Sequence, residues 1–286
     1  MRAAAIFGLG TSPADLKQFQ TGSAAEWRDG LPVSSGDADA ILIFGGDGTI
    51  HRHLAALARL RLPVLVVPAG SGNDFARALS LRSVADSVRA WQKFEAGGLE
   101  PRSIDLGLIT PANAPEKHRY FCCVAGCGID SAVARLANRM PRWLRARGGY
   151  AMGLVPAILR FAPFPLRVTM QKTGATQSSE SLTTLAAFAN TPFYGDGMRI
   201  APHAEMNDGL LDVCLIRDVN RLKLLSLFPT VYFGRHLNLR ESEYSKVESV
   251  QLETDVPREI YADGEYVCAT PAEIRAVPHA LRIIAP

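Results

Sequence analysis

Two glycine-rich segments combine small residues with carboxylate and hydroxyl side chains in a pattern suited to phosphate chemistry. The first is Gly45-Gly46-Asp47-Gly48-Thr49, which lies between an apolar run and an amphipathic one. Glycines allow a ligand to approach the backbone closely, and the N–H groups of such a turn at a helix N-terminus can bind a phosphate. The segment matches neither GxxxxGK[ST] nor GxGxxG, which excludes a P-loop and a dinucleotide fingerprint. Alone, it would also fit a tight turn without a ligand.

The second segment is Pro68-Ala69-Gly70-Ser71-Gly72-Asn73-Asp74-Phe75, which also follows an apolar run. Ser71 supplies a hydroxyl, and Asn73 or Asp74 can cap a helix. Helix capping would explain this segment if it stood alone. Ligands of α/β proteins bind at the carboxyl ends of the strands, so two such segments after successive strands predict one shared anion-binding crevice.

Two later segments place carboxylates beside a glycine. Asp263-Gly264-Glu265 places two carboxylates on one face if it forms a strand, whereas a turn through Gly264 leaves their placement open. Asp208-Gly209, taken alone, fits a simple hairpin turn. Taken alone, the first of these segments is more typical of a surface turn.

The first 110 residues have the pattern of an α/β domain. Apolar runs at 3–7, 40–44 and 64–67 are typical of buried strands. Between the last two, residues 50–60 repeat apolar side chains at helical spacing, which predicts a right-handed strand–helix–strand unit with parallel strands. Further helices are expected over 73–79 and 83–95, followed by a strand over 104–109 that leaves the domain.

The rest of the chain changes to short strands separated by turns, which indicates an antiparallel sandwich or barrel. The expected strands cover 119–124, 166–171, 182–190, 211–216, 247–254, 259–261, 273–277 and 281–284. Helical stretches are expected at 132–159 and 221–233. We therefore expect an α/β nucleotide-binding N-terminal domain (1–110) and a C-terminal β-sandwich domain (111–286).

The composition is that of an ordinary globular protein, with 48% apolar and 21% charged residues among 286, which excludes a disordered chain and a coiled coil. The net charge of +3 is too small to indicate a nucleic-acid partner. The five cysteines lack a CxxC pair, so we expect reduced thiols in a cytoplasmic protein. The N-terminal apolar run is too short for a signal peptide, and no apolar run is long enough to predict a transmembrane helix.

The two glycine-rich segments resemble the catalytic domain of the diacylglycerol kinase and sphingosine kinase family, in its bacterial soluble lipid kinase form. Four more segments match this family in order: YF and VAGCGID within 120–130, ANTPFYGDGM at 189–198, APHAEMNDGLLDV at 201–213 and DGE at 263–265. The match fails near the N-terminus. There the first strand is followed by Gly8-Leu9-Gly10-Thr11 instead of the family's NPxSG motif, and the early strand–helix unit is short.

This resemblance implies a kinase that uses ATP and Mg²⁺ to phosphorylate a lipid hydroxyl, on diacylglycerol or on a sphingoid or ceramide-like lipid. It implies a cleft between the domains for ATP and a last strand that returns to the first domain. It makes Glu265 the proton acceptor, while Asp263 orients Glu265 or coordinates metal, and it places a metal site at the Asp208 carboxylate and the backbone oxygens of Glu205 and Leu210. The ATP-binding residues would come from both glycine-rich segments: Gly45, Gly46, Asp47, Gly48, Thr49, Ile50, His51, Ser71, Asn73 and Asp74.

Residues 131–179 contain no Asp or Glu but eight Arg or Lys residues, with aromatic and apolar side chains between them. Such a surface suits anionic headgroups, although a solvated basic helix would have the same composition. A lipid substrate lies in a bilayer, so we expect a cytoplasmic protein that contacts an anionic membrane surface peripherally. A homodimer is compatible with the sequence.

Two other functions stay open. NAD kinases share GGDGT and the two-domain plan, although SGNDFARAL at 71–79 favours the lipid kinases. The missing NPxSG motif also allows a catalytically silent regulator that binds a nucleotide or a lipid. ATP turnover with a panel of lipids would discriminate between these functions.

Overall fold

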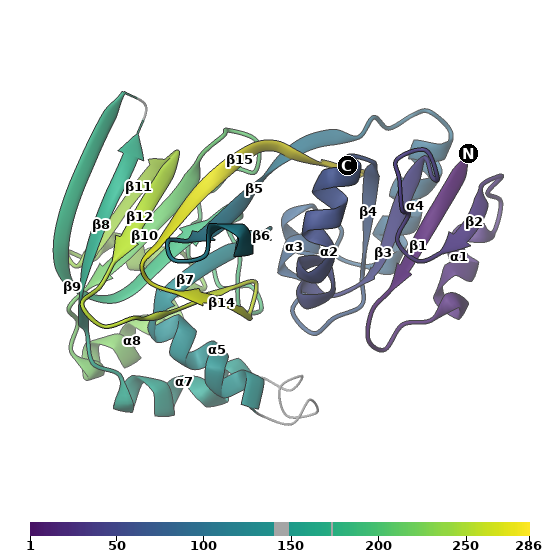
Figure 1. Cartoon of the computed structure of the whole chain (residues 1–286). Coiled ribbons are helices and arrows are strands. Elements are labelled where there is room, and N and C mark those ends of the chain that lie inside the picture. The colour runs from purple at the N-terminus through teal and green to yellow at the C-terminus, as the bar shows by residue number, and fades with distance from the viewer. Residues whose placement is uncertain (140–148, 173) are drawn as a thin grey trace.

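The computed structural model of the protein describes residues 1–139, 149–172 and 174–286. Its N-terminal part is a parallel sheet in the order β2–β1–β3–β4, formed by Glu26–Asp29, Arg2–Phe7, Ala40–Gly45 and Pro63–Pro68. Helices α2 (Asp47–Leu60), α3 (Asp74–Ala78) and α4 (Val84–Glu95) accompany this sheet (Figure 1). Every residue of β3 is buried, as expected for a strand covered on both faces. The predicted strand–helix–strand unit is confirmed.

Two details of this part differ from the prediction. Helix α2 begins at Asp47 rather than Ile50, so part of the first glycine-rich segment forms its first turn, which lacks the apolar spacing used to predict helices. Strand β2 was not predicted because its sequence, EWRD, is mostly exposed at the sheet edge. The early unit is short, as expected, with only the 3₁₀ helix η1 (Pro13–Leu16) and helix α1 (Lys17–Gln20) between β1 and β2.

Two long strands connect this sheet to the rest of the molecule. Strand β15 (Ala272–Ile283) runs antiparallel to β5 (Arg102–Pro111), and its last residues pair in parallel with β4. Both strands extend across the middle of the molecule in Figure 1. The two predicted strands at 273–277 and 281–284 are therefore one strand, with an irregularity between Val277 and Leu281. The end of the chain returns to the N-terminal sheet.

The C-terminal part is a β-sandwich whose two layers share β9. The first half of β9 pairs with β8, and the second half pairs with β7 and β10. Fully buried side chains such as Phe121, Phe164 and Phe188 fill the core between the layers. Besides β5 and β15, its strands are β6 (Arg119–Phe121), β7 (Val124–Gly128), β8 (Phe164–Lys172), β9 (Ala175–Ala189), β10 (Leu211–Arg217), β11 (Ser242–Val247), β12 (Ser249–Glu253), β13 (Glu259–Ala262) and β14 (Glu265–Ala269).

Helices α5 (Ile129–Arg139), α7 (Gly149–Arg160) and α8 (Arg221–Val231) lie together at one side of the sandwich (Figure 1). The helix predicted over 132–159 is thus described as two helices, and residues 140–148 lie outside the described residues. Two short 3₁₀ helices, η2 (Pro115–Lys117) and η3 (Arg235–Asn238), lie in connections. Within the described ranges, no helix has both the length and the apolar character needed to cross a bilayer.

Candidate active site

The first glycine-rich segment connects β3 to α2 and places Gly46 at the N-cap of that helix. A Cβ atom built on Gly46 would lie only 2.8 Å from the Cα atom of Gly70 in the second segment. The two glycine-rich loops are therefore in direct backbone contact, which glycine at both positions permits. The positive end of the α2 dipole and its unpaired N–H groups make this junction suitable for phosphate oxygens.

Side chains predicted to bind a nucleotide instead fix the shape of these loops. The Asp47 carboxylate accepts hydrogen bonds from the backbone N–H groups of Asp74 and Phe75, both at 3.0 Å, and so caps α3. Asn73 closes the second loop, because its Oδ1 accepts from Gly70 N and its Nδ2 donates to Gly70 O, both at 2.8 Å. Ser71 is exposed on the second loop and is the hydroxyl that a ligand can reach there.

Asp74 connects the second loop to the C-terminal part. Its carboxylate accepts hydrogen bonds from Asp196 N at 2.9 Å and Gly197 N at 2.8 Å, and it also pairs with Arg77. Only 4% of Asp74 is exposed. Asp74 is therefore a buried acceptor that positions the segment 194–198 against the second loop.

The carboxyl groups of Asp47 and Asp74, in the two glycine-rich segments, both have raised pKa values. Burial, followed by the neighbouring Asp74 carboxylate, raises the pKa of Asp47 to about 6, although two backbone N–H groups act in the opposite direction. Burial also raises the pKa of Asp74. A positive charge bound nearby would favour the ionised form of both groups.

Asp263 and Gly264 form the two-residue turn of the β13–β14 hairpin, with φ angles of +50° and +85°. Positive φ at both positions is the reason that Asp-Gly suits such a turn. The Asp263 side chain is fully buried, and its carboxylate accepts hydrogen bonds from Cys122 N at 2.9 Å and Cys123 N at 2.8 Å. Its Oδ2 atom also lies 3.0 Å from His51 Nδ1 of α2. Asp263 thus fixes the hairpin against the N-terminal part.

Glu265 has the opposite environment. Its side chain is exposed, and its Oε1 atom lies 3.3 Å from the position that a Cβ atom on Gly48 would occupy. Glu265 of the β13–β14 hairpin therefore faces the first turn of α2. The turn through Gly264 separates the two carboxylates, so that one is a buried acceptor and the other is exposed.

Thr49, Ile50 and His51, the last three residues predicted for the first ATP-binding loop, are placed differently from one another. Thr49 and Ile50 are 7% and 1% exposed, so their side chains pack inside the protein. Burial alone would lower the pKa of His51, but the hydrogen bond and charge of Asp263, with Glu265 nearby, raise it overall. His51 is therefore a contact between α2 and the Asp263 turn, a role that its position in the sequence did not indicate.

The predicted metal ligands lie in the loop before β10, and one of them, the Asp208 carboxylate, pairs with a lysine. Lys246 Nζ of β11 is 2.5 Å from Asp208 Oδ2, and 4.0 Å from Glu205 Oε1. Partial burial acts to lower the pKa of Lys246, but these acidic neighbours outweigh it and raise the pKa overall. An ammonium group thus occupies the position beside Asp208 where the cation was expected, and this set of donors does not fit Mg²⁺.

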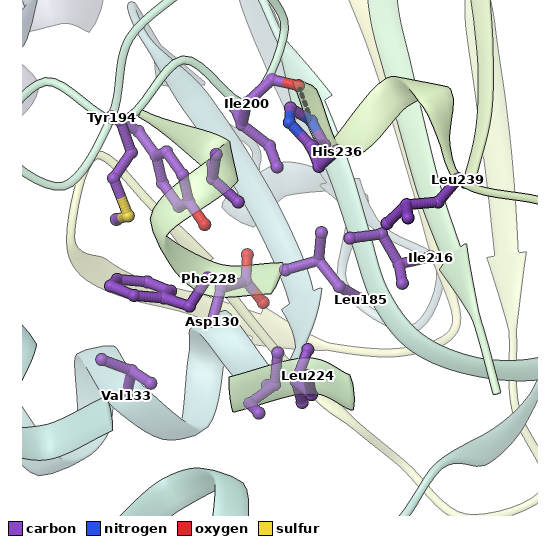
Figure 2. Close-up of a pocket in the computed structure, with 13 residues that line it drawn as sticks. Asp130, Val133, Leu185, Tyr194, Ile200, Ile216, Leu224, Phe228, His236 and Leu239 are labelled. Carbon is purple, nitrogen blue, oxygen red and sulfur yellow. Dashed lines mark hydrogen bonds between the residues drawn. The ribbon is translucent and has the colours of Figure 1, made fainter. Parts of the chain in front are cut away.

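An apolar pocket, not predicted from the sequence, opens between α5, α8 and the sandwich (Figure 2). Val133 of α5, Leu185 of β9 and Phe228 of α8 form its walls. Tyr194 and Met198 belong to the segment that Asp74 holds, so the pocket wall is connected to the second glycine-rich loop. The space, counted to its open mouth, is about 700 Å³ and includes open solvent, so this is an open pocket rather than an enclosed cavity.

Asp130 brings a carboxyl group into this pocket, as Figure 2 shows. Burial raises its pKa to about 7, although the backbone N–H of Ser131, at 2.8 Å, stabilises the charged form. The folded protein therefore holds this proton more tightly than the unfolded chain, whose carboxyl has its ordinary pKa near 3.8. The stability that this group contributes is complete below about pH 4 and is lost as the pH rises towards 7.

We expect Asp130→Asn to remove this pH dependence, because an amide cannot ionise and keeps the acceptor for Ser131. Its free energy of unfolding should match that of the wild type near pH 4 and exceed it above pH 7 by up to about 4 kcal/mol, at roughly 1.4 kcal/mol per pKa unit. Thermal unfolding between pH 4 and pH 8 measures this difference, with Asp218→Asn at an exposed position as the control. An equal difference at every pH would contradict the assignment.

Two buried polar residues that the sequence analysis missed organise the junction between the parts. Asp105 of β5 is fully buried and accepts hydrogen bonds from Gly209 N at 2.7 Å and His279 N at 2.8 Å. Asn190 donates to Asp105 O and Cys122 O, both at 3.0 Å. Asp105 interrupts an apolar strand, and this is the signal that could have identified it.

Comparison with known families agrees with this architecture. Residues 14–109 match the model of the diacylglycerol kinase catalytic domain. Residues 123–285 match the model of the YegS C-terminal NAD kinase beta sandwich-like domain. A diacylglycerol kinase of Mycobacterium tuberculosis is 36% identical over 289 residues, which cover 99% of this chain and 88% of that protein. A diacylglycerol kinase of Bacillus subtilis is 27% identical over 258 residues, covering 87% and 78% respectively.

Solved structures share the fold. A crystal structure of a diacylglycerol kinase from Bacillus anthracis matches with a TM-score of 0.71 and 18% identity, covering 100% of this chain and 97% of that one. An NAD kinase from Archaeoglobus fulgidus matches with a TM-score of 0.50 and 16% identity, covering 99% and 92%. Because the family models and the mycobacterial relative together match nearly the whole sequence, the chain belongs to the diacylglycerol kinase family of lipid kinases.

Proposed function

We propose that this lipid kinase transfers the γ-phosphoryl group of Mg·ATP to a hydroxyl group of a membrane lipid. Diacylglycerol is the first candidate, because it is the substrate in the names of the relatives. The observation that carries the proposal is the connection between the second glycine-rich segment and the apolar pocket. The backbone N–H groups of Asp196 and Gly197 donate to Asp74 of the second glycine-rich segment. Tyr194 and Met198 of the same segment 194–198 line the pocket.

In this proposal the two glycine-rich loops bind the phosphates of ATP. The N–H groups at the start of α2 and the exposed Ser71 supply donors, and the contact between Gly46 and Gly70 leaves no side chain between the loops. The magnesium ion enters with the nucleotide and neutralises charge on the phosphate oxygens. The pKa of Asp47 would fall when this positive charge is bound.

Glu265 is the proton acceptor in this proposal. The lipid hydroxyl oxygen attacks the γ-phosphorus, the bond to the β–γ bridging oxygen breaks, and ADP leaves while the Glu265 carboxylate takes the hydroxyl proton. The exposed position of Glu265 opposite Gly48 supports this role. Asp263 is the less suitable group, because two backbone N–H groups and His51 occupy its carboxylate.

The pocket would hold an acyl chain of the lipid. Its walls are mostly aliphatic and aromatic, and each methylene group moved from water into such surroundings contributes about 0.8 kcal/mol. The raised pKa of Asp130 keeps much of this carboxyl uncharged near neutral pH, which suits an apolar guest.

Measurement of ADP release tests the proposal. Purified protein with Mg·ATP should release ADP when diacylglycerol, a sphingoid base or ceramide is supplied in mixed micelles, and the preferred lipid identifies the substrate. NAD serves as an alternative acceptor in the same assay. Nucleotide binding without turnover on every lipid would indicate a silent regulator, and turnover on NAD alone would indicate an NAD kinase; either result contradicts the proposal.

Peripheral membrane contact is the second part of the proposal, and α7 and α8 are its best-supported surface. Leu222 at the start of α8 is 81% exposed and Phe233, just beyond its end, is 72% exposed, while Leu159 of α7 is 53% exposed. Leu224 and Phe228 on α8 line the pocket. A helix with apolar side chains towards both the pocket and the solvent suits the boundary between a bilayer and a lipid site.

The basic stretch predicted to meet anionic lipid is only partly described. Its residues 140–148 lie outside the described residues, as does the side chain of Arg139. Arg135 pairs with Glu259 at 3.6 Å, and Arg167 pairs with Glu180 at 2.8 Å, so these two charges are partly neutralised. Apolar contact by α7 and α8 is therefore the part of the membrane proposal that the described side chains support.

We expect Leu222→Gln combined with Phe233→Gln to weaken binding to anionic vesicles by at least about tenfold. Full burial of each side chain is worth about 1.5–3 kcal/mol, and about 1.4 kcal/mol is a factor of ten. Vesicle sedimentation measures this, and turnover of a short-chain, water-soluble substrate should change little. The matched control is Val33→Gln, which replaces an apolar side chain that is 82% exposed on the N-terminal part. Unchanged vesicle binding in the double variant would exclude this surface.

A further inference from the structure

Lys246 lies at the centre of an acidic cluster at the start of the β10–β11 pair. In the sheet register Lys246 is directly opposite Asp212, whose Oδ2 atom is 3.9 Å from Lys246 Nζ. The same ammonium group is 2.5 Å from Asp208 Oδ2 and 4.0 Å from Glu205 Oε1. One lysine therefore faces three carboxylates that come from a loop and a strand.

Asp212 shows that this cluster is built around a cation. Asp212 is only 1% exposed, and its Oδ1 atom accepts a hydrogen bond from Tyr244 OH at 2.6 Å. Its Oδ2 atom is buried without a hydrogen-bond partner and lies on the Lys246 side. A buried carboxylate oxygen without a partner needs a neighbouring positive charge, and Lys246 supplies it.

A divalent ion cannot share this position with the lysine. Mg²⁺ and Ca²⁺ bind several oxygen ligands at about 2.0–2.6 Å, and Asp208 Oδ2 is already at hydrogen-bond distance from the ammonium group. The other oxygen, Asp208 Oδ1, accepts a hydrogen bond from Leu210 N at 3.0 Å. Both oxygens of the carboxylate expected to bind metal are therefore occupied by groups of the protein itself.

We propose that the Lys246 ammonium group replaces a divalent cation in holding the segment Glu205–Asp212, so that this part of the fold is independent of metal. The segment lies against the connecting strand β5, because Gly209 N donates to Asp105 Oδ2 at 2.7 Å and Asp105 N donates to Met206 O at 2.6 Å. Lys246 thus positions the β10–β11 pair relative to the strand that links the two parts of the molecule. The proposal does not depend on which lipid is phosphorylated, or on whether any is.

Thermal unfolding of nucleotide-free protein, prepared in EDTA, tests this inference. The wild-type melting temperature should be the same with EDTA, with millimolar MgCl₂ and with millimolar CaCl₂. In Lys246→Met the three carboxylates lose their partner, so the melting temperature should fall in EDTA and recover by several degrees in CaCl₂. Ligand binding to the folded state alone produces such a shift. Terbium luminescence, excited through Tyr244, should appear in the variant and be absent in the wild type.

Lys223→Met is the matched control, because Lys223 of α8 pairs with the single carboxylate of Glu241 at 2.5 Å. This variant should not gain a response to CaCl₂. Asp208→Asn should lower the melting temperature equally with and without cation. If Lys246→Met fails to fold in EDTA, its refolding in CaCl₂ is the readout, and rescue supports the inference. Stabilisation of the wild type by either cation, or no response of Lys246→Met in both formats, would overturn it.

Discussion

Glu265→Gln should lower kcat on the true lipid substrate by about 10²–10⁴-fold and leave ATP affinity nearly unchanged, since this is the usual contribution of a general base. Gln keeps the shape of the side chain but cannot accept the hydroxyl proton. Glu265 is exposed beside Gly48, so the substitution leaves no buried group without a partner. Steady-state kinetics with the preferred lipid and calorimetric titration with ATP measure the two quantities.

Glu259→Gln is the matched control, because Glu259 lies on the same hairpin at the end far from the turn, opposite Ala269. Its kcat should stay near the wild-type value. Asp263→Asn should act differently, since it weakens the bond with His51 and leaves a backbone N–H of Cys122 or Cys123 without its acceptor. We expect this variant to lose about 1–3 kcal/mol of stability together with activity. Near-normal kcat in Glu265→Gln would exclude Glu265 as the proton acceptor.

Gly46→Val should abolish measurable ATP binding and also destabilise the protein. A Cβ atom at this position would lie 2.8 Å from Gly70 Cα, so the two glycine-rich loops must separate. Loss of two charge-assisted hydrogen bonds to phosphate, at about 1.5–3 kcal/mol each, corresponds to a loss of affinity of at least about 10²-fold. Overpacking at such a contact also lowers the free energy of unfolding by about 1–3 kcal/mol.

Two other glycines separate the effects on binding and folding. Gly36→Val is the control for the substitution itself, since a Cβ atom there meets nothing closer than Ser34 Oγ at 3.7 Å, and it should change neither property. At Gly48 the nearest atom is the mobile end of Glu265, so Gly48→Ala should preserve stability better than Gly46→Val. Thermal melts and ATP titrations of the three variants test this order. Wild-type ATP affinity in folded Gly46→Val would contradict the assignment of the loops.

The sequence by itself determined the parts of this protein that depend on local patterns. Continuous apolar runs predicted the strands at 3–7, 40–44 and 64–67, because strands buried on both faces need apolar side chains at every position. The two glycine-rich segments predicted two loops that meet closely, and the structure brings Gly46 and Gly70 into contact, since close backbone approach requires glycine at such positions. Their order with the four later segments indicated the lipid kinase family, which the comparisons confirm.

Only the tertiary structure decided what each polar residue in these motifs contacts. Asp74 and Asn73 lie in a motif predicted to bind ATP, yet one holds the segment 194–198 and the other closes its own loop. Asp263 and Glu265 are two residues apart, and only the conformation of the turn between them makes one buried and the other exposed. Likewise, Lys246 follows Asp208 by many residues, and its role depends on the pairing of β10 with β11. Hydrogen bonds and ion pairs form between groups that folding brings together from distant parts of the chain, and sequence spacing carries no record of those distances.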